Sequence, residues 1–334
     1  MPDQRAGDAG RWSTEELLLR AAWYYYKDEL TQDEIARRLS MSRASVGRLL
    51  DRARRVGLVS INLNTEHLDA FELSGELRKM FGLAEALVVP DDEKEPFDHH
   101  VLNARVGLGG AQFMSTHLRP GASLGVGWGE TVSRAIAATS FGAVGPVHMV
   151  TLTGGVEGYL QTILSSKGEL ATDPANLTSA TVIPSPIMAS TSALAAALRE
   201  EPTIQEVLRQ ACAVEYALVG IGTPTADATI VHMGYLTGDD SRRLRERGVV
   251  GDILGQFFDA GGDVVDLPIH DRRIGIELAD LRRIPKVVGV AGGEHKAEAI
   301  LGALHGGFLD VLITNELAAM RLLELNRAGA PGRR

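Results

Sequence analysis

The sequence predicts an α/β protein in two parts, a small helical domain at the N-terminus and a larger domain with a mostly parallel sheet. Between residues 15 and 55 the apolar side chains recur at helical spacing. From about residue 83 short apolar runs alternate with helical segments, and several of these runs end at glycine just before a helix begins. That order is typical of strands buried in a parallel sheet.

Length and composition favour a globular protein with a real core. The chain has 334 residues, more than one ordinary domain needs, and is 45% hydrophobic and 23% charged. No apolar run approaches the roughly 20 residues of a membrane helix, and the polar N-terminus has no signal-peptide core. A cytoplasmic location is therefore expected. Cys212, the single cysteine, lies in an apolar stretch, which predicts a buried thiol and excludes a disulfide framework.

Charge is divided unevenly along the chain. The net charge is −9, but residues 1–62 carry eleven Lys and Arg against nine Asp and Glu, a balance of +2. The remaining residues carry 23 basic and 34 acidic side chains, a balance of −11. An acidic bulk argues against nucleic-acid binding over the whole surface, whereas a local basic face in the first part stays compatible with phosphate contacts.

These patterns predict five segments along the chain. A disordered start precedes a helix-turn-helix domain, a linker helix joins that domain to a sugar or polyol effector domain, and a flexible tail ends the chain. In that order the expected ranges are 1–14, 15–62, 63–82, 83–327 and 328–334.

The N-terminal helices have clear start and stop signals. One helix is expected over 15–30, and Thr31 with Glu34 three residues later forms a capping box for the next, which should end near Leu39. After a break at Ser40-Met41-Ser42, another helix is expected over Arg43–Arg55, and Gly57 ends it. The following LVSINLN alternates like a short strand, either a wing or a connecting strand.

The segment QDEIARRLSMSRASVGRLLD is the most specific local signal in the chain. It has apolar residues where two steeply crossing helices touch, a small residue at Ala36, and an excess of arginine. These features predict a helix-turn-helix whose second helix enters the major groove, rather than a solvated face or a partner surface. The predicted DNA contacts are Gln32, Ser42, Arg43, Ala44, Ser45, Arg48 and Arg52, with Gln32 on phosphate and the early helix residues on base edges.

The larger domain should contain eight strands. They are expected at 86–90, 123–127, 147–153, 180–186, 214–222, 263–267, 287–292 and 311–314. Four of these runs end in glycine-rich turns, which begin near Gly127, Thr153, Ile221 and Ala291. Glycine at such a turn lets backbone N–H groups approach an anion, and the following helix N-terminus adds its positive end. Together with Thr131, Thr153 and Lys296, the turns predict a phosphate or polyhydroxyl site at the carboxyl edge of the sheet.

The chain resembles the sorbose-operon-regulator (SorC) family of sugar-binding transcriptional regulators. The resemblance runs from about Leu17 to Leu325 and rests on RAAWYYYKDELTQDEIARRLSMSRASVGRLLDRARRVGLV, GVGWGETV, TGG, VGIG, GDILGQFFDAGG and AGGEHKAEAILGALHGGFLDVLITNELAA, in this order and spacing. It implies a larger domain folded like ribose-5-phosphate isomerase and glucosamine-6-phosphate deaminase, without their catalysis. It also implies a sugar, polyol or, preferably, sugar-phosphate effector.

The resemblance also implies a set of effector contacts. It places effector oxygens on Thr131 and on the turns, hydroxyl groups on Asp252 and a phosphate on Lys296. The family's usual Thr-Asp-Glu after the last strand stands here as Thr314-Asn315-Glu316, a departure at a predicted hydroxyl contact or pocket-floor hydrogen bond. The full predicted set is Gly127, Trp128, Gly129, Thr131, Thr153, Gly154, Gly155, Asp252, Lys296 and Asn315.

The resulting hypothesis is a DNA-binding regulator of a carbohydrate-catabolism operon. We expect no catalytic residue or cofactor, because a metabolic enzyme has no obvious use for a helix-turn-helix. We also expect no metal site, because His99 and His100, as neighbours on a helix, diverge and make a poor metal pair. The expected partners are double-stranded, palindromic operator DNA, the effector, and further copies of the chain in a homodimer or homotetramer. The alternative is a sugar-phosphate isomerase or deaminase with an appended helix-turn-helix, using acids such as Asp252 and Glu316.

Overall fold

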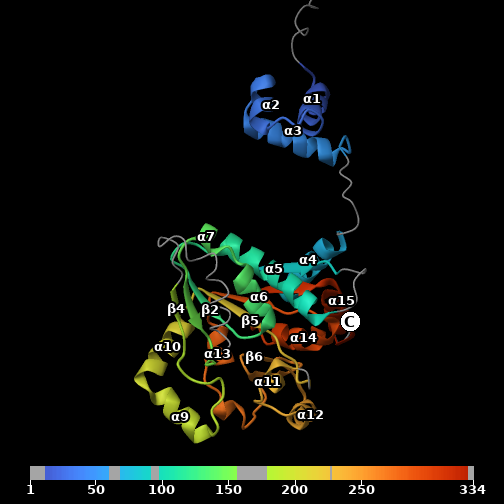
Figure 1. Cartoon of the computed structure of the whole chain (residues 1–334). Helices are drawn as coiled ribbons and strands as arrows, with labels where there is room; N and C mark the ends of the chain where they lie inside the picture. Colours follow the sequence, from blue (N-terminus) through green and yellow to red (C-terminus); the bar gives the residue numbers. More distant parts are fainter. Residues whose placement is uncertain (1–11, 60–67, 92–97, 156–178, 226–227, 330–334) are drawn as a thin grey trace, which may run out of the picture. The chain divides into compact units, whose positions relative to one another are not determined.

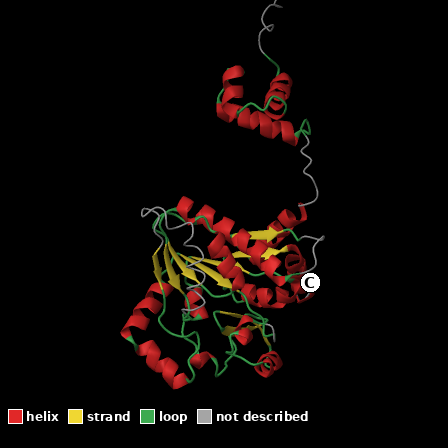
Figure 2. Ribbon diagram, in the orientation of Figure 1, coloured by secondary structure: helices red, strands yellow, loops and turns green. Residues whose placement is uncertain are grey.

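The computed structural model describes residues 12–59, 68–91, 98–155, 179–225 and 228–329. Residue contacts divide the chain into two compact units, Met1–Thr65 and Glu66–Arg334. Figures 1 and 2 show that the first is helical and the second mixes helices with strands.

The first unit contains α1 (Thr14–Tyr26), α2 (Gln32–Arg38) and α3 (Arg43–Arg55). Serine or threonine caps each N-terminus: Ser13, Thr31 and Ser42 accept from backbone N–H groups three residues ahead. The predicted capping box at Thr31 is confirmed, because Glu34 Oε2 accepts from Thr31 N at 2.8 Å. The helices enclose a small apolar core of Ala21, Ile35, Ala36, Val46 and Leu50.

The second unit is built on a parallel sheet of seven strands, which confirms the predicted fold class. The strand order is β1-β9-β8-β5-β2-β3-β4, and every neighbouring pair is parallel. The strands are β1 (Glu85–Val89), β2 (Ser123–Val126), β3 (His148–Thr151), β4 (Ser179–Thr181), β5 (Tyr216–Gly220), β8 (Lys286–Val290) and β9 (Val311–Asn315).

Helices cover both faces of this sheet. Successive strand residues point to opposite faces, so Leu218, Val288 and Ile313 join the core under α5, α6 and α7, whereas Val219, Val287 and Leu312 join the core on the other face. The first layer contains α5 (His99–His117), α6 (Glu130–Ala138) and α7 (Phe141–Val144). The other contains α4 (Leu68–Phe81), α9 (Ser192–Glu200), α10 (Pro202–Cys212), α13 (Leu278–Leu281), α14 (Ala297–His305) and α15 (Glu316–Gly329).

An antiparallel hairpin lies outside the main sheet. β6 (Val249–Ile253) and β7 (Gln256–Asp259) are joined by Leu254 and Gly255, both at positive φ. Two short helices, α11 (Thr229–His232) and α12 (Gly238–Glu246), precede it in the chain. Two single turns of 3-10 helix, η3 (His270–Arg272) and η4 (Glu294–Lys296), complete the described elements.

Three expectations about elements need correction. Residues 263–267 form no strand, because only Val264 makes an isolated bridge, with Phe258. The strand expected over 180–186 spans Ser179–Thr181. The helix expected as a linker, α4, packs on β1 and α15 with Leu77 fully buried, so it is an element of the second unit. Most of the strand expected at 58–64 lies outside the described residues, and Leu58 and Val59 are in a bend.

Candidate functional site

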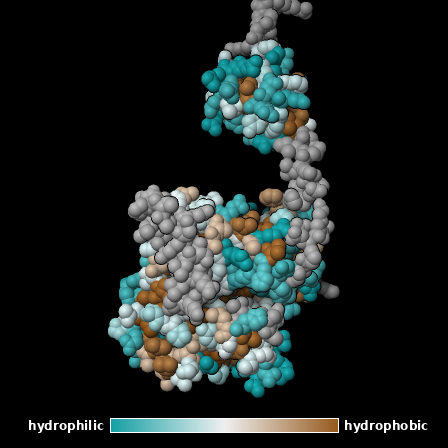
Figure 3. Space-filling model, in the orientation of Figure 1, coloured by the Kyte–Doolittle hydropathy of each residue, from teal (hydrophilic) through white to brown (hydrophobic). Residues whose placement is uncertain are grey.

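The first candidate site is the exposed face of α3. Val46, Leu50 and Ala53 turn into the core of the first unit, which leaves Ala44, Arg48 and Arg52, spaced four residues apart, on the opposite side. Arg43 and Ser42 are also exposed, whereas Gln32 and Ser45 are half-buried. The side of the first unit drawn in Figure 3 is mostly hydrophilic. The structure therefore places the predicted DNA contacts on and beside one helix face.

Hydrogen bonds order the beginning of α3. Ser42 Oγ accepts from Ser45 N at 3.2 Å and lies 2.9 Å from Ser45 Oγ, and Arg48 donates to that same Ser45 hydroxyl at 3.0 Å. Arg43 pairs with Asp33 of α2 at 3.6 Å, with both side chains exposed. Ser42 thus caps the helix and Ser45 orients Arg48, roles that the sequence did not indicate.

The second candidate site is a pocket of about 300 Å³ in the second unit. It opens where β2 and β5 lie side by side in the sheet. From β2 the chain continues through β3 and β4 to one edge, and from β5 it continues through β8 and β9 toward the other. Such a switch point is the usual ligand site of an open parallel sheet. The turns after β2, β5 and β8, the first turn of α5 and the β6–β7 hairpin contribute its lining.

A hydrogen-bonded chain of polar side chains forms one wall. Thr131 donates to Asn103 at 3.0 Å, Asn103 donates to Glu130 at 3.0 Å, and Glu130 lies 2.7 Å from His100 Nδ1. The hydrogen bond and charge of Glu130 raise the pKa of His100. Partial burial opposes ionisation of Glu130, but the hydrogen bonds from His100 and Asn103 outweigh it and lower its pKa. The N-terminus of α6, where Gly129 is the N-cap residue at φ +126°, lies at this wall.

Asp252 is the buried acid of the pocket. Its backbone forms a bridge with Gly222, and its Oδ2 accepts from Gly255 N at 3.1 Å. Burial raises the pKa of Asp252 to about 6, although the Gly255 hydrogen bond and the charge of Lys296 both act to lower it. This carboxyl group therefore changes protonation near neutral pH.

Lys296 and His295 belong to the turn that follows β8. Both line the pocket together with Gly292, and Lys296 N donates to Gly293 O at 2.9 Å in η4. The rings of His295 and His99 are in edge-to-face contact, 5.3 Å between centroids. The pocket therefore combines one lysine, several histidines and one buried carboxyl group.

Five of the ten predicted effector residues line this pocket: Trp128, Gly129, Thr131, Asp252 and Lys296. The other five do not. The N–H groups of Gly127, Gly154 and Gly155 donate to main-chain carbonyls of Leu218, Ile274 and Ser185, so the sheet and its loops already use them. Thr153 is fully buried and bridges Gly275. The structure therefore does not bring the Thr153-Gly154-Gly155 turn into the lining.

Asn315 also lies outside the lining. Its side chain is buried and contacts Gly293 and Asp91 rather than facing the pocket. The neighbouring Glu316 accepts from Asp91 N at 2.8 Å and is likewise absent from the lining. Of the two acids that the enzyme alternative named, Asp252 alone lines the described pocket.

Sequence reasoning missed several lining residues. His99, His100 and Asn103 come from the first turns of α5, and Thr223 and Thr225 follow β5 with their hydroxyl groups 3.0 Å apart. The histidines were expected on a helix surface, and they do face solvent, but at the rim of the pocket. Parallel strands place their carboxyl ends on one edge of the sheet. Because α5 begins after the carboxyl end of β1, its first turn could have been predicted to lie at the pocket.

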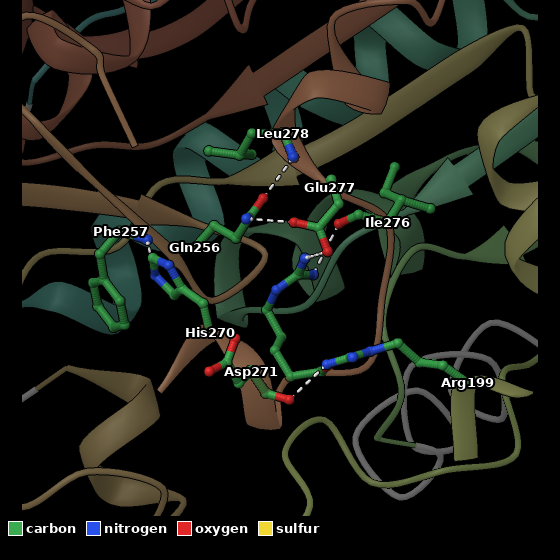
Figure 4. Close-up of polar contacts among 9 residues, drawn as sticks. Arg199, Gln256, Phe257, His270, Asp271, Ile276, Glu277 and Leu278 are labelled. Atoms are coloured by element: carbon green, nitrogen blue, oxygen red, sulfur yellow. Dashed lines mark hydrogen bonds and ion pairs between the residues drawn. The ribbon is translucent and has the colours of Figure 1, made fainter. Parts of the chain in front are cut away.

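A buried arginine is connected to the β6–β7 hairpin through Glu277 and Gln256. Arg273 is 2% exposed, and its guanidinium contacts Glu277 Oε1 at 2.7 Å and Ile276 O at 2.8 Å. Figure 4 shows Glu277 facing Gln256 of β7, whose amide also accepts from Leu278 N at 2.6 Å. His270 stacks on Phe257 and accepts from its N–H, and burial lowers the His270 pKa to about 4. His270 is therefore a structural residue, not a pocket residue.

Other predicted features have simple outcomes. Cys212 ends α10 and is exposed, so the expectation of a buried thiol is wrong. The segment around it is apolar on its inner side only, where Ala211 packs. Within the described ranges, no three His, Cys, Asp or Glu side chains are arranged to hold a metal ion. In the same ranges, no helix combines the length and hydropathy that crossing a membrane requires.

Comparison with known proteins identifies the family. Residues 65–324 match the family described as a putative sugar-binding domain. The chain is 38% identical to transcriptional regulator LsrR of Enterobacter sp. (strain 638), over 97% of this chain and 99% of that protein. The chain belongs to the SorC family of sugar-binding transcriptional regulators.

Solved structures agree with this assignment. The full-length sorbitol operon regulator SorC from Klebsiella pneumoniae has a TM-score of 0.64 at 28% identity, over 92% of this chain and 98% of that one. The putative sugar-binding domain of a transcriptional repressor from Vibrio fischeri has a TM-score of 0.66 at 31% identity, over 77% and 99%. The expected family, fold and general function, a sugar-responsive transcriptional regulator, are thereby confirmed.

Proposed function

We propose that this SorC-family protein binds operator DNA through α3 and that a phosphorylated sugar or polyol in the pocket of the second unit controls that binding. The supporting observation is the composition of the pocket. Lys296 favours an anion, whereas Asp252 and the threonines offer acceptors and donors for hydroxyl groups. A cavity of about 300 Å³ also lies at the lower end of the range of small-molecule pockets.

The control is proposed to be allosteric and without turnover of the effector. Of the acids that line the described pocket, Asp252 accepts a hydrogen bond from Gly255 N and Glu130 is hydrogen-bonded to His100 and Asn103, so both carboxyl groups have structural partners. The alternative, isomerase or deaminase activity, requires product formation. Incubation of the purified protein with aldose and amino-sugar phosphates, followed by chromatography, should return the sugars unchanged.

The direct test of the proposed function is ligand screening followed by DNA binding. Sugars, polyols and their phosphates are added to the full chain, and ligands that bind only the folded state raise Tm. A hit should then change the affinity for operator DNA, measured by fluorescence anisotropy. Stabilisation by no member of the panel, or a hit without effect on DNA binding, contradicts the proposal.

Because the target is DNA, we place the protein in the cytoplasm, where α3 can reach it.

We further propose that the protein acts as a symmetric homodimer or homotetramer. A single helix-turn-helix covers one half-site, and regulators of this kind gain affinity by placing two such helices about one DNA turn apart. The operator is therefore expected to be an inverted repeat.

A further inference from the structure

Asn315 occupies a junction between three parts of the second unit. It is the last residue of β9, which lies between β8 and β1 in the sheet. Its side chain is 1% exposed. Polar groups buried to this degree persist only when their hydrogen bonds are made, so the partners of this amide define what it does.

Both ends of the amide are used. Asn315 Oδ1 accepts from Gly293 N at 2.7 Å, in the turn after β8. Asn315 Nδ2 donates to the two carboxylate oxygens of Asp91, after β1, at 2.9 and 2.8 Å. An ionised carboxylate accepts but cannot donate. The amide therefore joins the Gly293 N–H to the Asp91 carboxylate, whereas an ionised aspartate in its place would have no donor for Asp91.

Asp91 is itself held from two sides. Its Oδ2 accepts from Leu317 N at 2.9 Å, and its own N–H donates to Glu316 Oε2 at 2.8 Å. These are reciprocal bonds to the first turn of α15, where an acceptor is favourable. Asn315 thus connects the pocket turn to an anchored carboxylate and not to a mobile surface group.

The bond to Gly293 fixes the backbone that carries the pocket residues. Gly293 has φ +107°, and its carbonyl accepts from Lys296 N at 2.9 Å. A Cβ on Gly292 would lie 3.3 Å from Asn315 Oδ1, so the turn also packs closely on the amide. His295 and Lys296, which line the pocket, follow directly.

We propose that Asn315 is a positioning residue of the effector site, holding the Gly292-Gly293 turn so that His295 and Lys296 keep their places at the pocket. This inference rests on the proposed function of the pocket. It does not make Asn315 an effector contact.

The test exchanges the amide and the carboxylate. In Asn315→Asp, two carboxylates face each other and repel unless they share a proton. The double variant Asp91→Asn with Asn315→Asp restores one donor and one acceptor in the reverse order. Asn326→Asp, the same chemical change on the outer part of α15, is the matched control. All variants retain the other charged and titratable groups of these elements, which are Glu294, His295 and Lys296 in η4, Glu316, Arg321, Glu324 and Arg327 in α15, and Arg105 of α5, which donates to Pro90 O at 2.7 Å.

The first readout is hydrogen–deuterium exchange of the full chain over residues 290–297, at about pH 6 and about pH 8. At the higher pH, exchange in Asn315→Asp should be about tenfold faster than in the wild type, because a charge-assisted hydrogen bond is lost. At the lower pH, the exchange rate of Asn315→Asp should approach the wild-type rate. The double variant and Asn326→Asp should match the wild type at both. Wild-type exchange in Asn315→Asp, or no rescue in the double variant, overturns the inference.

The second readout is binding of inorganic sulfate, which is doubly charged at both pH values, measured as the shift in Tm. Asn315→Asp should bind about tenfold more weakly at the higher pH, and the double variant should recover. If exchange responds as expected while the wild type binds neither sulfate nor any sugar phosphate, the proposed function fails and the hydrogen-bonded junction stands. If the wild type binds and Asn315→Asp binds equally well at both pH values, the positioning role fails.

Discussion

Asp252 is a carboxyl group whose protonation is set by its surroundings. It is 5% exposed, accepts one backbone N–H and has a pKa of about 6, compared with an ordinary value of 3.8. Between those two pH values the folded protein holds a proton that the unfolded chain has released. Ionisation of Asp252 therefore lowers the free energy of unfolding as pH rises toward 6, by about 3 kcal/mol once complete.

Asp252→Asn should remove this dependence. The amide keeps the shape and can accept from Gly255 N without carrying a charge. Chemical denaturation at about pH 5 and about pH 8 measures the difference in stability between variant and wild type. That difference should favour the variant by about 1–1.5 kcal/mol more at the higher pH, because more than half of the total loss has already occurred at about pH 5. An equal difference at both pH values means that Asp252 is already ionised in the acidic sample.

Lys296 provides the corresponding test of the anion. If the effector is phosphorylated, Lys296→Ala should weaken it about tenfold to a hundredfold, the cost of one charge-assisted hydrogen bond, and leave operator binding without ligand unchanged. Calorimetry with a phosphorylated hit measures the loss. Unchanged affinity excludes Lys296 from the phosphate contact, and an uncharged effector predicts a small effect.

Arg48 tests the face of α3. Arg48→Ala should weaken binding to the operator by about 1–3 kcal/mol and relax base preference at one position in each half-site. Arg37→Ala is the comparison variant, since Arg37 is exposed on α2. If Arg37 contacts a phosphate, its removal should lower the affinity for specific and random DNA equally. Fluorescence anisotropy with both DNAs separates them, and an equal loss for Arg48→Ala assigns it to phosphate too.

At the level of elements, the β6–β7 hairpin depends on a close approach between two backbones. Gly222, after β5, bridges Asp252, and a Cβ at Gly222 would lie 2.0 Å from Asp252 Oδ1. Gly222→Ala should therefore destabilise the protein by roughly 2–4 kcal/mol. Gly142→Ala in α7, where nothing lies within 4 Å of the added carbon, should be neutral or stabilising. Urea unfolding of both variants checks this, and equal midpoints contradict the packing argument.

Elements with strong periodicity were predictable, and this hairpin was not. Buried strands such as β8 and β9 are short, mainly apolar runs, and β8 ends at the glycine turn that follows it whereas β9 leads directly into α15. β6 and β7 are short, include Gly251 and Asp252, and turn at Leu254, a residue type that rarely adopts positive φ. Their pairing depends on Gly222 and on the Arg273 and Glu277 contacts, which are distant in sequence.

The same distinction applies to the site. Turn glycines and Lys296 have local signals, whereas the positions of Asn103, His99 and Asn315 depend on which strands are neighbours in the sheet. A turn such as Thr153-Gly154-Gly155 has the same local sequence as a binding turn. The N–H groups of Gly154 and Gly155 nevertheless donate to carbonyl groups of Ile274 and Ser185, which are distant from this turn in the sequence.

At the scale of the whole molecule, the two compact units predict separable functions. A fragment spanning Glu66–Arg334 should fold, as the isolated sugar-binding domain from Vibrio fischeri does, and bind the effector with the affinity of the full chain. It should not bind the operator. Circular dichroism, calorimetry and anisotropy test the three statements, and operator binding by the fragment contradicts the assignment of α3.

Assembly is the other prediction at this scale. Light scattering of the full chain at micromolar concentration should give the mass of a dimer or tetramer. Binding to a palindromic operator should be tighter than to a single half-site by far more than the statistical factor of about two. A monomer with and without DNA contradicts the proposed mode of action.

The sheet order also constrains how the protein is made. β1 pairs with β9, so Glu85 cannot pair until Val311 has been synthesised. The helices α1, α2 and α3 of the first unit are synthesised long before that point. Domains fold in turn as the nascent chain leaves the ribosome, and long-range strand pairing is slow. A transcript truncated before codon 311 therefore yields a chain with a finished α3 but no β9, and so no support beneath the pocket turn. Nonsense mutations late in the reading frame should therefore leave the second unit without an interior strand and part of its core, although α1, α2 and α3 are already complete.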